Sequence, residues 1–256
     1  VTTAGALDSG IATPDKMYDG PASLKVYGSQ VTNFANKDVG KLSLAKAFAK
    51  STNTIFAQVG LDLGAPRLVN AAKKFGLDKS PPFELPVAKS SIPSPGSMDK
   101  VMVAWTAVGQ GKTLVTPLQM ALISAAVANE GKVYRPFIVD TVGEENDLVY
   151  RSQRPRLWSD ATTKETSKQI TQMMEDVVLS GTGRAAALTG IMVAGKTGTA
   201  EFGKESAPHA WFIGFAPADD PKIAIAVFLE QGGLGGQAAA PIARQVFEKA
   251  IGSGIQ

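Results

Sequence analysis

Val193-Ala194-Gly195-Lys196-Thr197-Gly198-Thr199-Ala200-Glu201 is the stretch that decides the fold. An apolar run, 191–194, leads into a lysine, a glycine and two hydroxyl side chains, and a second apolar run, 210–216, follows a short loop. Apolar runs separated by polar turn residues are typical of neighbouring strands. The stretch therefore predicts a strand that carries polar side chains on its rim.

The side chains of such a strand alternate between its two faces. Lys196 and Gly198 are therefore expected on one face, and Thr197 and Thr199 on the other. A glycine in a strand leaves room for another backbone to approach closely. Gly198 is thus the position where we expect a ligand backbone to lie against the strand.

Residues 190–197 also fit the spacing G-x-x-x-x-G-K-[ST] of a phosphate-binding loop, which would indicate an NTPase. Such a loop needs an apolar strand before its first glycine and a helix directly after the lysine. Here the apolar residues lie between the two glycines, and Gly198 and Gly203 follow the lysine. We therefore reject the NTPase interpretation.

The composition is that of an ordinary globular protein, with 44% hydrophobic and 19% charged residues among 256. The net charge of +3 is mild and the basic residues are scattered, which argues against a nucleic acid partner. There is no cysteine, so a thiol nucleophile is excluded, and the compartment stays open. His209 is the only histidine, and we expect it at the rim rather than in catalysis or a metal site. No metal or other cofactor is predicted.

The longest apolar run, 223–229, is far shorter than the roughly 18 residues of a membrane span. The chain begins at Val1 without a charged leader, and we interpret it as a processed or excised piece. Residues 1–12 are typical of the tail of a helix whose start precedes Val1.

The remaining patterns predict helices around one antiparallel hairpin. Thr13 to Lys41 is expected to be a loop with at most a small hairpin, and 80–96 an irregular loop rich in proline. Minor strands are expected at 134–142 and 148–151, and the hairpin at 210–216 and 222–230. With no repeat and no clear linker, 1–256 is predicted to be one domain. Helices are expected from Ser43 to Lys50, Ile55 to Leu63, Pro66 to Gly76, Ser97 to Ala107, Pro117 to Ala128, Thr163 to Leu179 and Pro241 to Ile251.

Ser51-Thr52-Asn53 interrupts two of these helical patterns. A serine and an asparagine two residues apart on a tight turn can direct both side chains to one point. The alternative is that Asn53 only caps the second helix, which is a common role of asparagine.

Three features occur in one order: Ser51-x-Asn53, the turn Gly181-Thr182-Gly183, and Lys196-Thr197-Gly198 on a strand before a hairpin. Gly109-Gln110-Gly111 and the stretch 116–120 add to them. On these residues the chain resembles the transpeptidase domain of penicillin-binding proteins over nearly its whole length. The stretch 8–20 is most similar to a monofunctional actinobacterial branch of that family. The resemblance implies an α/β fold with a central antiparallel sheet, flanking helices and a helical subdomain.

The resemblance implies serine acyl transfer without a cofactor. A serine of an S-x-x-K motif attacks the penultimate D-alanyl carbonyl of a peptidoglycan stem peptide, and β-lactams acylate the same serine. By the same resemblance, Ser51 relays protons and Asn53 holds the acyl side-chain amide and the base lysine, while Lys196 supplies positive potential. Thr197 and Thr199 are expected to bind the substrate carboxylate. Gly198 keeps the strand accessible, and the Thr199 N–H forms half of the oxyanion hole.

The nucleophile itself is not evident in the sequence. Ser43 and Ser97 each begin an S-x-x-K stretch, but both are typical of helix N-caps. Ser43 is also too near Ser51 to face it across a cleft, and Ser97 falls on the wrong side of Ser51 for the family order. We expect the true motif upstream of Val1, together with the first two strands of the family's sheet.

The resemblance further implies work in cell wall synthesis, cell shape and division, at the extracytoplasmic face of the cell membrane and through an N-terminal anchor. A membrane glycan polymerase is an expected partner. Two alternatives on the same fold are a non-catalytic β-lactam sensor and a serine β-lactamase. Gln110 and the stretch 116–119 resemble the biosynthetic enzymes more than the sensors.

Overall fold

The computed structural model describes residues 1–142, 151–152, 154–201 and 206–254. Its centre is a three-stranded antiparallel sheet, in the order β11-β10-β9, built from β9 (Ala194–Ala200), β10 (His209–Ala216) and β11 (Ile223–Leu229). The predicted strand and hairpin are thus confirmed. In the register, Lys196 of β9 lies opposite Ile213 of β10.

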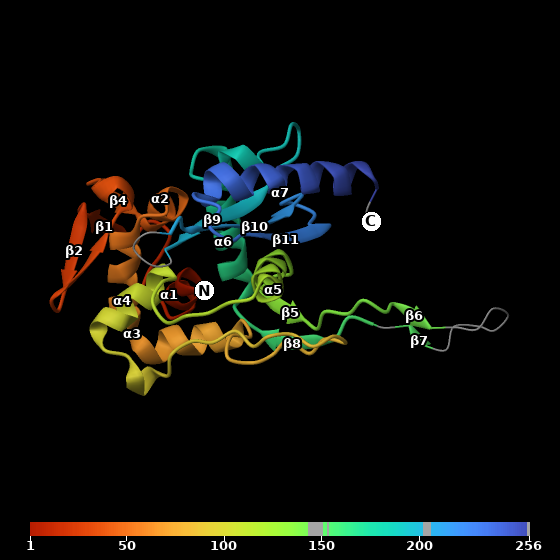
Figure 1. Cartoon of the computed structure of the whole chain (residues 1–256), viewed down its shortest axis with the longest axis horizontal. Helices are drawn as coiled ribbons and strands as arrows, with labels where there is room; N and C mark the ends of the chain where they lie inside the picture. Colours follow the sequence, from red (N-terminus) through yellow and green to blue (C-terminus); the bar gives the residue numbers. More distant parts are fainter. Residues whose placement is uncertain (143–150, 153, 202–205, 255–256) are drawn as a thin grey trace.

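Helices cover both faces of this sheet (Figure 1). α7 (Gly235–Gly252) packs on one face around Phe212, and α5 (Pro117–Ala128) and α6 (Lys164–Leu179) pack on the other around Phe215. Phe212 and Phe215 are both fully buried. Because they lie three residues apart on an extended strand, they point to opposite faces, and each anchors one layer of the core.

The helical part lies beyond the β9 edge and below it (Figure 1). It contains α2 (Leu44–Lys50), the long α3 (Asn53–Lys74) and α4 (Lys100–Val108), and α1 (Thr2–Asp8) packs against α3 and α6. Gly64 inside α3 has φ 75° and ψ 159°, which is not helical. The separate helix predicted to open at Pro66 therefore follows a real break, although hydrogen bonding continues across it.

The segment before α2 holds more strands than the sequence indicated. β1 (Met17–Gly20) pairs with β4 (Gly40–Ser43), and β2 (Ser23–Val26) pairs with β3 (Ser29–Thr32). The prediction of a loop with at most a small hairpin is wrong for β1 and β4. Each strand is only four residues long and buries one or two side chains, so its alternation is too short to detect.

A narrow arm extends from the opposite end of the molecule (Figure 1). β5 (Lys132–Tyr134) pairs with β8 (Leu157–Asp160), and β6 (Thr141–Val142) pairs with β7 (Arg151–Ser152). The minor strands predicted here are present in shorter form, and 148–150 lies outside the described residues. Short 3-10 turns complete the fold at Phe34–Asn36, Pro95–Ser97 and Arg184–Ala186.

Helix ends follow local capping, with three corrections. α5 begins at Pro117 as predicted. A wide face of it is buried, because both α6 and the sheet pack on it. The buried residues are Gln119, Leu122, Ile123, Ser124, Ala126 and Val127. α4 is capped by Asp99, whose carboxylate accepts from the Met102 N–H at 2.7 Å, and not by Ser97. α7 begins at Gly235, six residues before the predicted Pro241.

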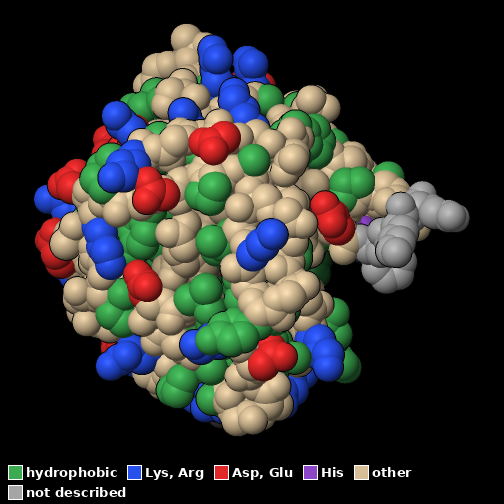
Figure 2. All heavy atoms as spheres, turned by 90° about the vertical axis from the view of Figure 1, so that its left-hand side faces the viewer, with side chains coloured by type: hydrophobic (Ala, Val, Ile, Leu, Met, Phe, Trp, Pro, Cys, Tyr) green, Lys and Arg blue, Asp and Glu red, His purple; other side chains and the backbone are tan. Residues whose placement is uncertain are grey.

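The surface carries mixed charge. Figure 2 shows one face on which basic and acidic side chains alternate without gathering by sign. Within the described ranges, no helix has the length and apolarity to cross a bilayer, and no three His, Asp or Glu side chains gather where they could hold a metal ion.

Candidate active site

Ser51 stands on the turn between α2 and α3. Its backbone is left-handed, with φ 55° and ψ 50°, which is uncommon for a residue other than glycine and is found often at functional sites. The turn is fixed by the Ser51 N–H, which donates to Phe48 O at 3.1 Å, and by the Thr52 N–H, which donates to Ala47 O at 3.0 Å. The hydroxyl of Ser51 is thereby held in place next to β9.

Lys196 of β9 meets Ser51 across 145 residues of chain. Its Nζ donates to Ser51 Oγ at 2.8 Å and to the Thr197 carbonyl at 3.0 Å. The ammonium also lies 5.7 Å from the centre of the Phe48 ring. The predicted meeting of serine and lysine in one place is therefore confirmed, while their roles remain predictions.

The partners of this lysine within the described part of the chain are all neutral. Burial lowers the pKa of Lys196 to about 8, because no carboxylate offsets the loss of hydration. Lys196 is thus mainly charged at neutral pH, and its ammonium donates to the Ser51 hydroxyl. Lysines perturbed in this way by burial are typical of functional sites.

The two threonines of β9 point to the other face, as predicted. The hydroxyls of Thr197 and Thr182 are 2.6 Å apart. The Gly235 N–H, at the first residue of α7, donates to Thr199 Oγ1 at 3.3 Å. Two hydroxyls beside the N-terminus of an 18-residue helix make a suitable site for a carboxylate.

Close approach of α7 to β9 depends on Gly235. A Cβ at this position would lie 2.2 Å from Gly198 O and 2.3 Å from Trp211 O. A Cβ on Gly198 would lie 3.0 Å from the Trp211 Cβ. Gly198 is therefore required by packing against Trp211, in addition to the access to ligand that the sequence suggested.

Asn53 lies next to Ser51 at the start of α3, and its predicted role in holding the acyl side-chain amide and the base lysine stays a prediction. Its Nδ2 donates to Thr32 O of β3 at 2.9 Å, and it forms no hydrogen bond with Ser51 or Lys196 within the described residues. The alternative role as a helix cap is wrong, because Thr52 occupies the N-cap position of α3. Asn53 instead attaches the β2–β3 hairpin to the start of α3, at the edge of the site.

The sequence patterns did not assign a role to two further residues. Thr182 comes from the Gly-Thr-Gly turn, and its N–H donates to Ala49 O at 3.2 Å, which brings the turn beside α2. Gln110 comes from the Gly-Gln-Gly turn after α4, and its Nε2 donates to the Thr199 carbonyl at 3.1 Å. In both cases the only signal was a polar residue between glycines.

The two S-x-x-K stretches serve structure. Ser43 Oγ accepts from the Lys46 N–H at 3.3 Å as the N-cap of α2, as predicted. Ser97 Oγ donates to Ser94 O at 2.9 Å, and Lys100 Nζ donates to Tyr27 Oη at 2.7 Å. Neither serine hydroxyl is hydrogen-bonded to the side-chain amine of the lysine in its own stretch.

His209 and the aromatic residues around it line the far end of β10. His209 Nδ1 accepts from the Gln231 N–H at 3.0 Å, and its ring lies 5.4 Å from Phe228. Trp211 packs 4.4 Å from Phe228 between ring centres and is only half-buried, whereas Phe215 of the same strand is fully buried in the core.

Comparison with known families gives one clear match. The family model described as the penicillin binding protein transpeptidase domain matches residues 1–248. Peptidoglycan D,D-transpeptidase PbpA of Mycolicibacterium smegmatis is 35% identical over 99% of this chain and 54% of its own length. PbpA of Mycobacterium tuberculosis H37Rv is 36% identical over 98% of this chain and 53% of its own. The chain thus spans about half the length of the curated relatives that it matches.

Solved structures agree with the fold. The D,D-transpeptidase domain of a peptidoglycan glycosyltransferase from Eggerthella lenta has a TM-score of 0.92 and 34% identity, over 100% of this chain and 64% of that one. The imipenem acyl-enzyme complex of penicillin-binding protein A from M. tuberculosis has a TM-score of 0.90 and 36% identity, over 98% of this chain and 57% of that one. The predicted fold of helices on an antiparallel sheet is confirmed.

Proposed function

This chain belongs to the penicillin-binding protein transpeptidase family, and from that premise we propose that it carries out peptidoglycan D,D-transpeptidation and is acylated by β-lactams. The observation that carries the proposal is the 2.8 Å hydrogen bond from Lys196 Nζ to Ser51 Oγ, next to the hydroxyls of Thr197 and Thr199 at the N-terminus of α7. Relatives named as D,D-transpeptidases favour this reading over the sensor and β-lactamase alternatives.

In the proposed reaction, a serine Oγ attacks the penultimate D-alanyl carbonyl of a stem peptide and D-alanine leaves with a proton. An amine of a second stem peptide then displaces the serine and closes the cross-link. Ser51 relays the proton, since its hydroxyl both donates and accepts. Lys196 raises the positive potential that holds the substrate's terminal carboxylate against Thr197 and Thr199. The Thr199 N–H supplies half of the oxyanion hole.

Asn53 keeps in this proposal the role that the sequence predicted, through its amide oxygen. Its amide nitrogen is engaged by Thr32 O, so its Oδ1 is the atom left to receive the N–H of an acyl side chain or a base lysine. The β2–β3 hairpin would then orient Asn53 for that contact.

We place the nucleophile in sequence that precedes Val1, so that 1–256 is one transpeptidase domain completed from upstream. The support is that Ser43 and Ser97 already cap or bind backbone, while Lys46 is exposed and Lys100 binds Tyr27. An anchor in that upstream sequence would hold the domain at the extracytoplasmic face of the cell membrane. There a membrane glycan polymerase would supply the strands to be cross-linked.

The test compares this chain with an extended chain that adds the residues encoded immediately before Val1. Both are treated with penicillin G, and the intact mass and the modified peptide are determined by mass spectrometry. We expect acylation of the extended chain at an upstream serine and none of the shorter chain. Acylation mapped to Ser43 or Ser97, or none in either chain, would contradict the proposal.

A second measurement separates the biosynthetic enzyme from the β-lactamase alternative. The acylated extended chain is freed of excess penicillin G, and the loss of the adduct is followed over hours. A transpeptidase is expected to keep the adduct, and loss within seconds would favour the β-lactamase.

A further inference from the structure

The Gln110 side chain reaches β9 from the helical side of the site. α4 ends at Val108, and the Gly109 and Gly111 backbones on either side of Gln110 have φ of 90° and 80°. The Gln110 N–H donates to Trp105 O at 2.9 Å, which closes the turn on the end of α4. Positive φ at both neighbours makes a tight turn that glycine favours, and this turn projects the Gln110 side chain toward Thr199.

β9 is an edge strand. Among the residues that the structure describes, the order β11-β10-β9 gives it a strand neighbour on one side only. The backbone groups of an edge strand are open to an added strand, and extended peptides bind proteins in this way. The Gln110 side chain ends in a carboxamide, which has the same N–H donor as a peptide bond, and this donor lies 3.1 Å from the Thr199 carbonyl.

We propose that Gln110 is a placeholder for an acyl donor that lies along β9: its carboxamide pairs with the Thr199 carbonyl until the amide N–H of a donor takes that position. In this way Gln110 sets selectivity among acyl donors. A donor whose amide N–H pairs with the Thr199 carbonyl displaces Gln110. A donor that lacks this N–H leaves Gln110 where it is. The inference rests on the proposed function, because it concerns how the same groove selects its acyl donors.

Thr199 is built to allow this exchange. Its hydroxyl accepts from the Gly235 N–H of α7 at 3.3 Å, independently of its carbonyl. Gln110 can therefore leave while Thr199 stays attached to α7. The contact of Gln110 with Thr199 is exposed, whereas the bond from Lys196 to Ser51 is partly buried and involves neither residue, so the two contacts can open separately.

The test uses two β-lactams in the extended chain that adds the residues before Val1. Penicillin G carries an acylamino N–H beside its reactive ring, and imipenem carries a hydroxyethyl group there. The second-order rate constants of acylation are measured for wild type, Gln110→Ala and Gln110→Met. We expect the ratio of penicillin G to imipenem to rise roughly two- to tenfold in both variants, which is the effect of one neutral hydrogen bond.

Each outcome decides a different question. Gln110→Met keeps the length of the side chain but removes its hydrogen-bond donor. A rise of the penicillin G to imipenem ratio in Gln110→Ala alone would therefore reflect the space left by the shorter side chain, and it would overturn the placeholder proposal. An unchanged or lower ratio in both variants would overturn it as well. If the wild type is not acylated by either drug, the proposed function fails rather than the placeholder. Gln245→Ala, on the exposed side of α7, serves as the matched control and should keep the wild-type ratio.

A second readout is independent of acylation and uses the 256-residue chain. The side-chain amide protons of Gln110 are followed by NMR against those of exposed Gln245. We expect slower hydrogen exchange at Gln110 because of its bond to Thr199. Equal exchange at both positions would contradict the placeholder even if the chemistry is as proposed.

Discussion

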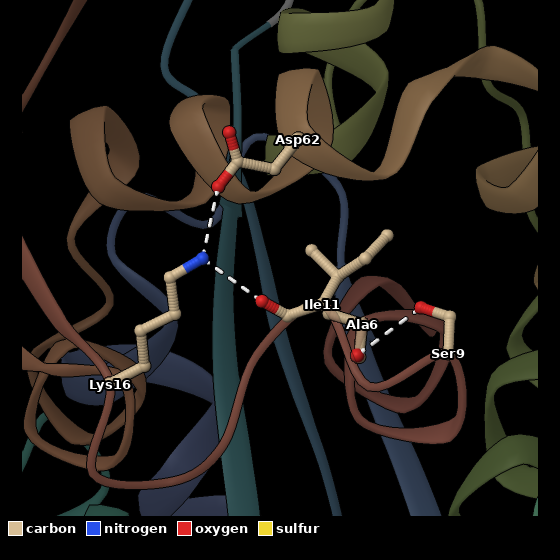
Figure 3. A network of polar contacts seen from close by, with 5 residues as sticks. All are labelled: Ala6, Ser9, Ile11, Lys16 and Asp62. Carbon is tan, nitrogen blue, oxygen red and sulfur yellow. Dashed lines mark hydrogen bonds and ion pairs between the residues drawn. The ribbon is translucent and has the colours of Figure 1, made fainter.

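Two lysines, Lys16 and Lys196, each tie together segments that are far apart in the chain, but they do so in opposite surroundings. Lys16 Nζ donates to Ile11 O at 2.9 Å and to Asp62 Oδ2 at 3.4 Å, beside the helix end where Ser9 bonds back to Ala6 (Figure 3). Lys196 donates to a serine and a carbonyl, and burial rather than a carboxylate dominates its surroundings.

Their proton affinities move in opposite directions. The nearby Tyr18, whose ring centre lies 4.9 Å from Lys16 Nζ, and after it the carboxylate of Asp62 raise the pKa of Lys16, whereas burial lowers the pKa of Lys196 to about 8. A paired surface lysine of the first kind holds a loop in place at small gain in stability. Burial disfavours the charged form of a lysine such as Lys196 and therefore costs free energy of folding. A lysine kept at that cost indicates selection for chemistry.

The largest expected contrast is in acylation. Lys196→Met in the extended chain should lower the second-order rate constant for penicillin G by about 10²–10³, the usual effect of removing one charge-stabilising group. Lys16→Met should leave it within about twofold, because the hydrogen-bond partners of Lys16 are Ile11 and Asp62, which take no part in the proposed reaction. Stopped-flow competition with a fluorescent penicillin measures both. Equal losses in the two variants would remove the distinction between the lysines.

The strand that carries Lys196 should be sensitive to its contact with α7. Gly235→Ala places a Cβ 2.2 Å from Gly198 O, so we expect a loss of about 1–3 kcal/mol in the free energy of unfolding. Gly252→Ala, in the same helix, meets nothing within 4 Å and is the matched control. Urea denaturation compares them. If both variants unfold at the same urea concentration, α7 does not hold β9 as described.

The pH dependence should distinguish the two lysines more finely. Lys196 is charged below its pKa of about 8 and neutral above it, so KM for anionic D-alanyl donors should rise roughly tenfold as pH passes through 8. Lys196→Arg stays charged, and its KM should remain flat from pH 6 to 9.5 even if it is higher throughout. A step near pH 8 that persists in the arginine variant would assign the titration to another group.

The same lowered pKa has a consequence for stability. Between pH 8 and the unfolded value of 10.5, the unfolded chain keeps a proton that folded Lys196 has released. Folding stability should therefore rise with pH across this window, and the rise should be absent in Lys196→Met. Urea midpoints at pH 7.5, 9 and 10 measure it.

The smallest expected effect concerns the surface pair. Asp62→Asn removes the carboxylate beside Lys16, and both side chains are about half exposed, so the loss should be at most about 1 kcal/mol. The difference from wild type should shrink in 1 M salt. A larger loss of stability that is unchanged in 1 M salt would mean that this ion pair contributes more to the fold than its exposed side chains suggest.

The sequence predicted the individual elements of this site better than the positions of these elements relative to one another. The strand at Lys196, the hairpin after it and the turn at Ser51 follow from periodicity and breakers, since each is a local property. That Lys196 and Ser51 meet came from the family resemblance alone, because no local pattern encodes a contact across 145 residues.

The failures share one physical cause, which is tertiary packing that overrides local preference. The β2–β3 hairpin, which provides Thr32 O as the partner of the Asn53 amide, was not predicted beyond a possible small hairpin, because its strands are too short to show alternation. α7 was started too late because Gly235 and Gly236 are weak helix formers, yet they alone allow the helix to reach β9. Gln110 could not be assigned because its role depends on the free edge of a strand 89 residues away.

The contact of Gly235 with Thr199 also orders events during biosynthesis. Ser51 leaves the ribosome before β9, and β9 leaves it before α7, so the contact between Thr199 and Gly235 forms only after α7 has been delivered. A nascent chain that ends before α7 therefore lacks the backbone N–H that holds the Thr199 hydroxyl, and this part of the site is assembled late in synthesis.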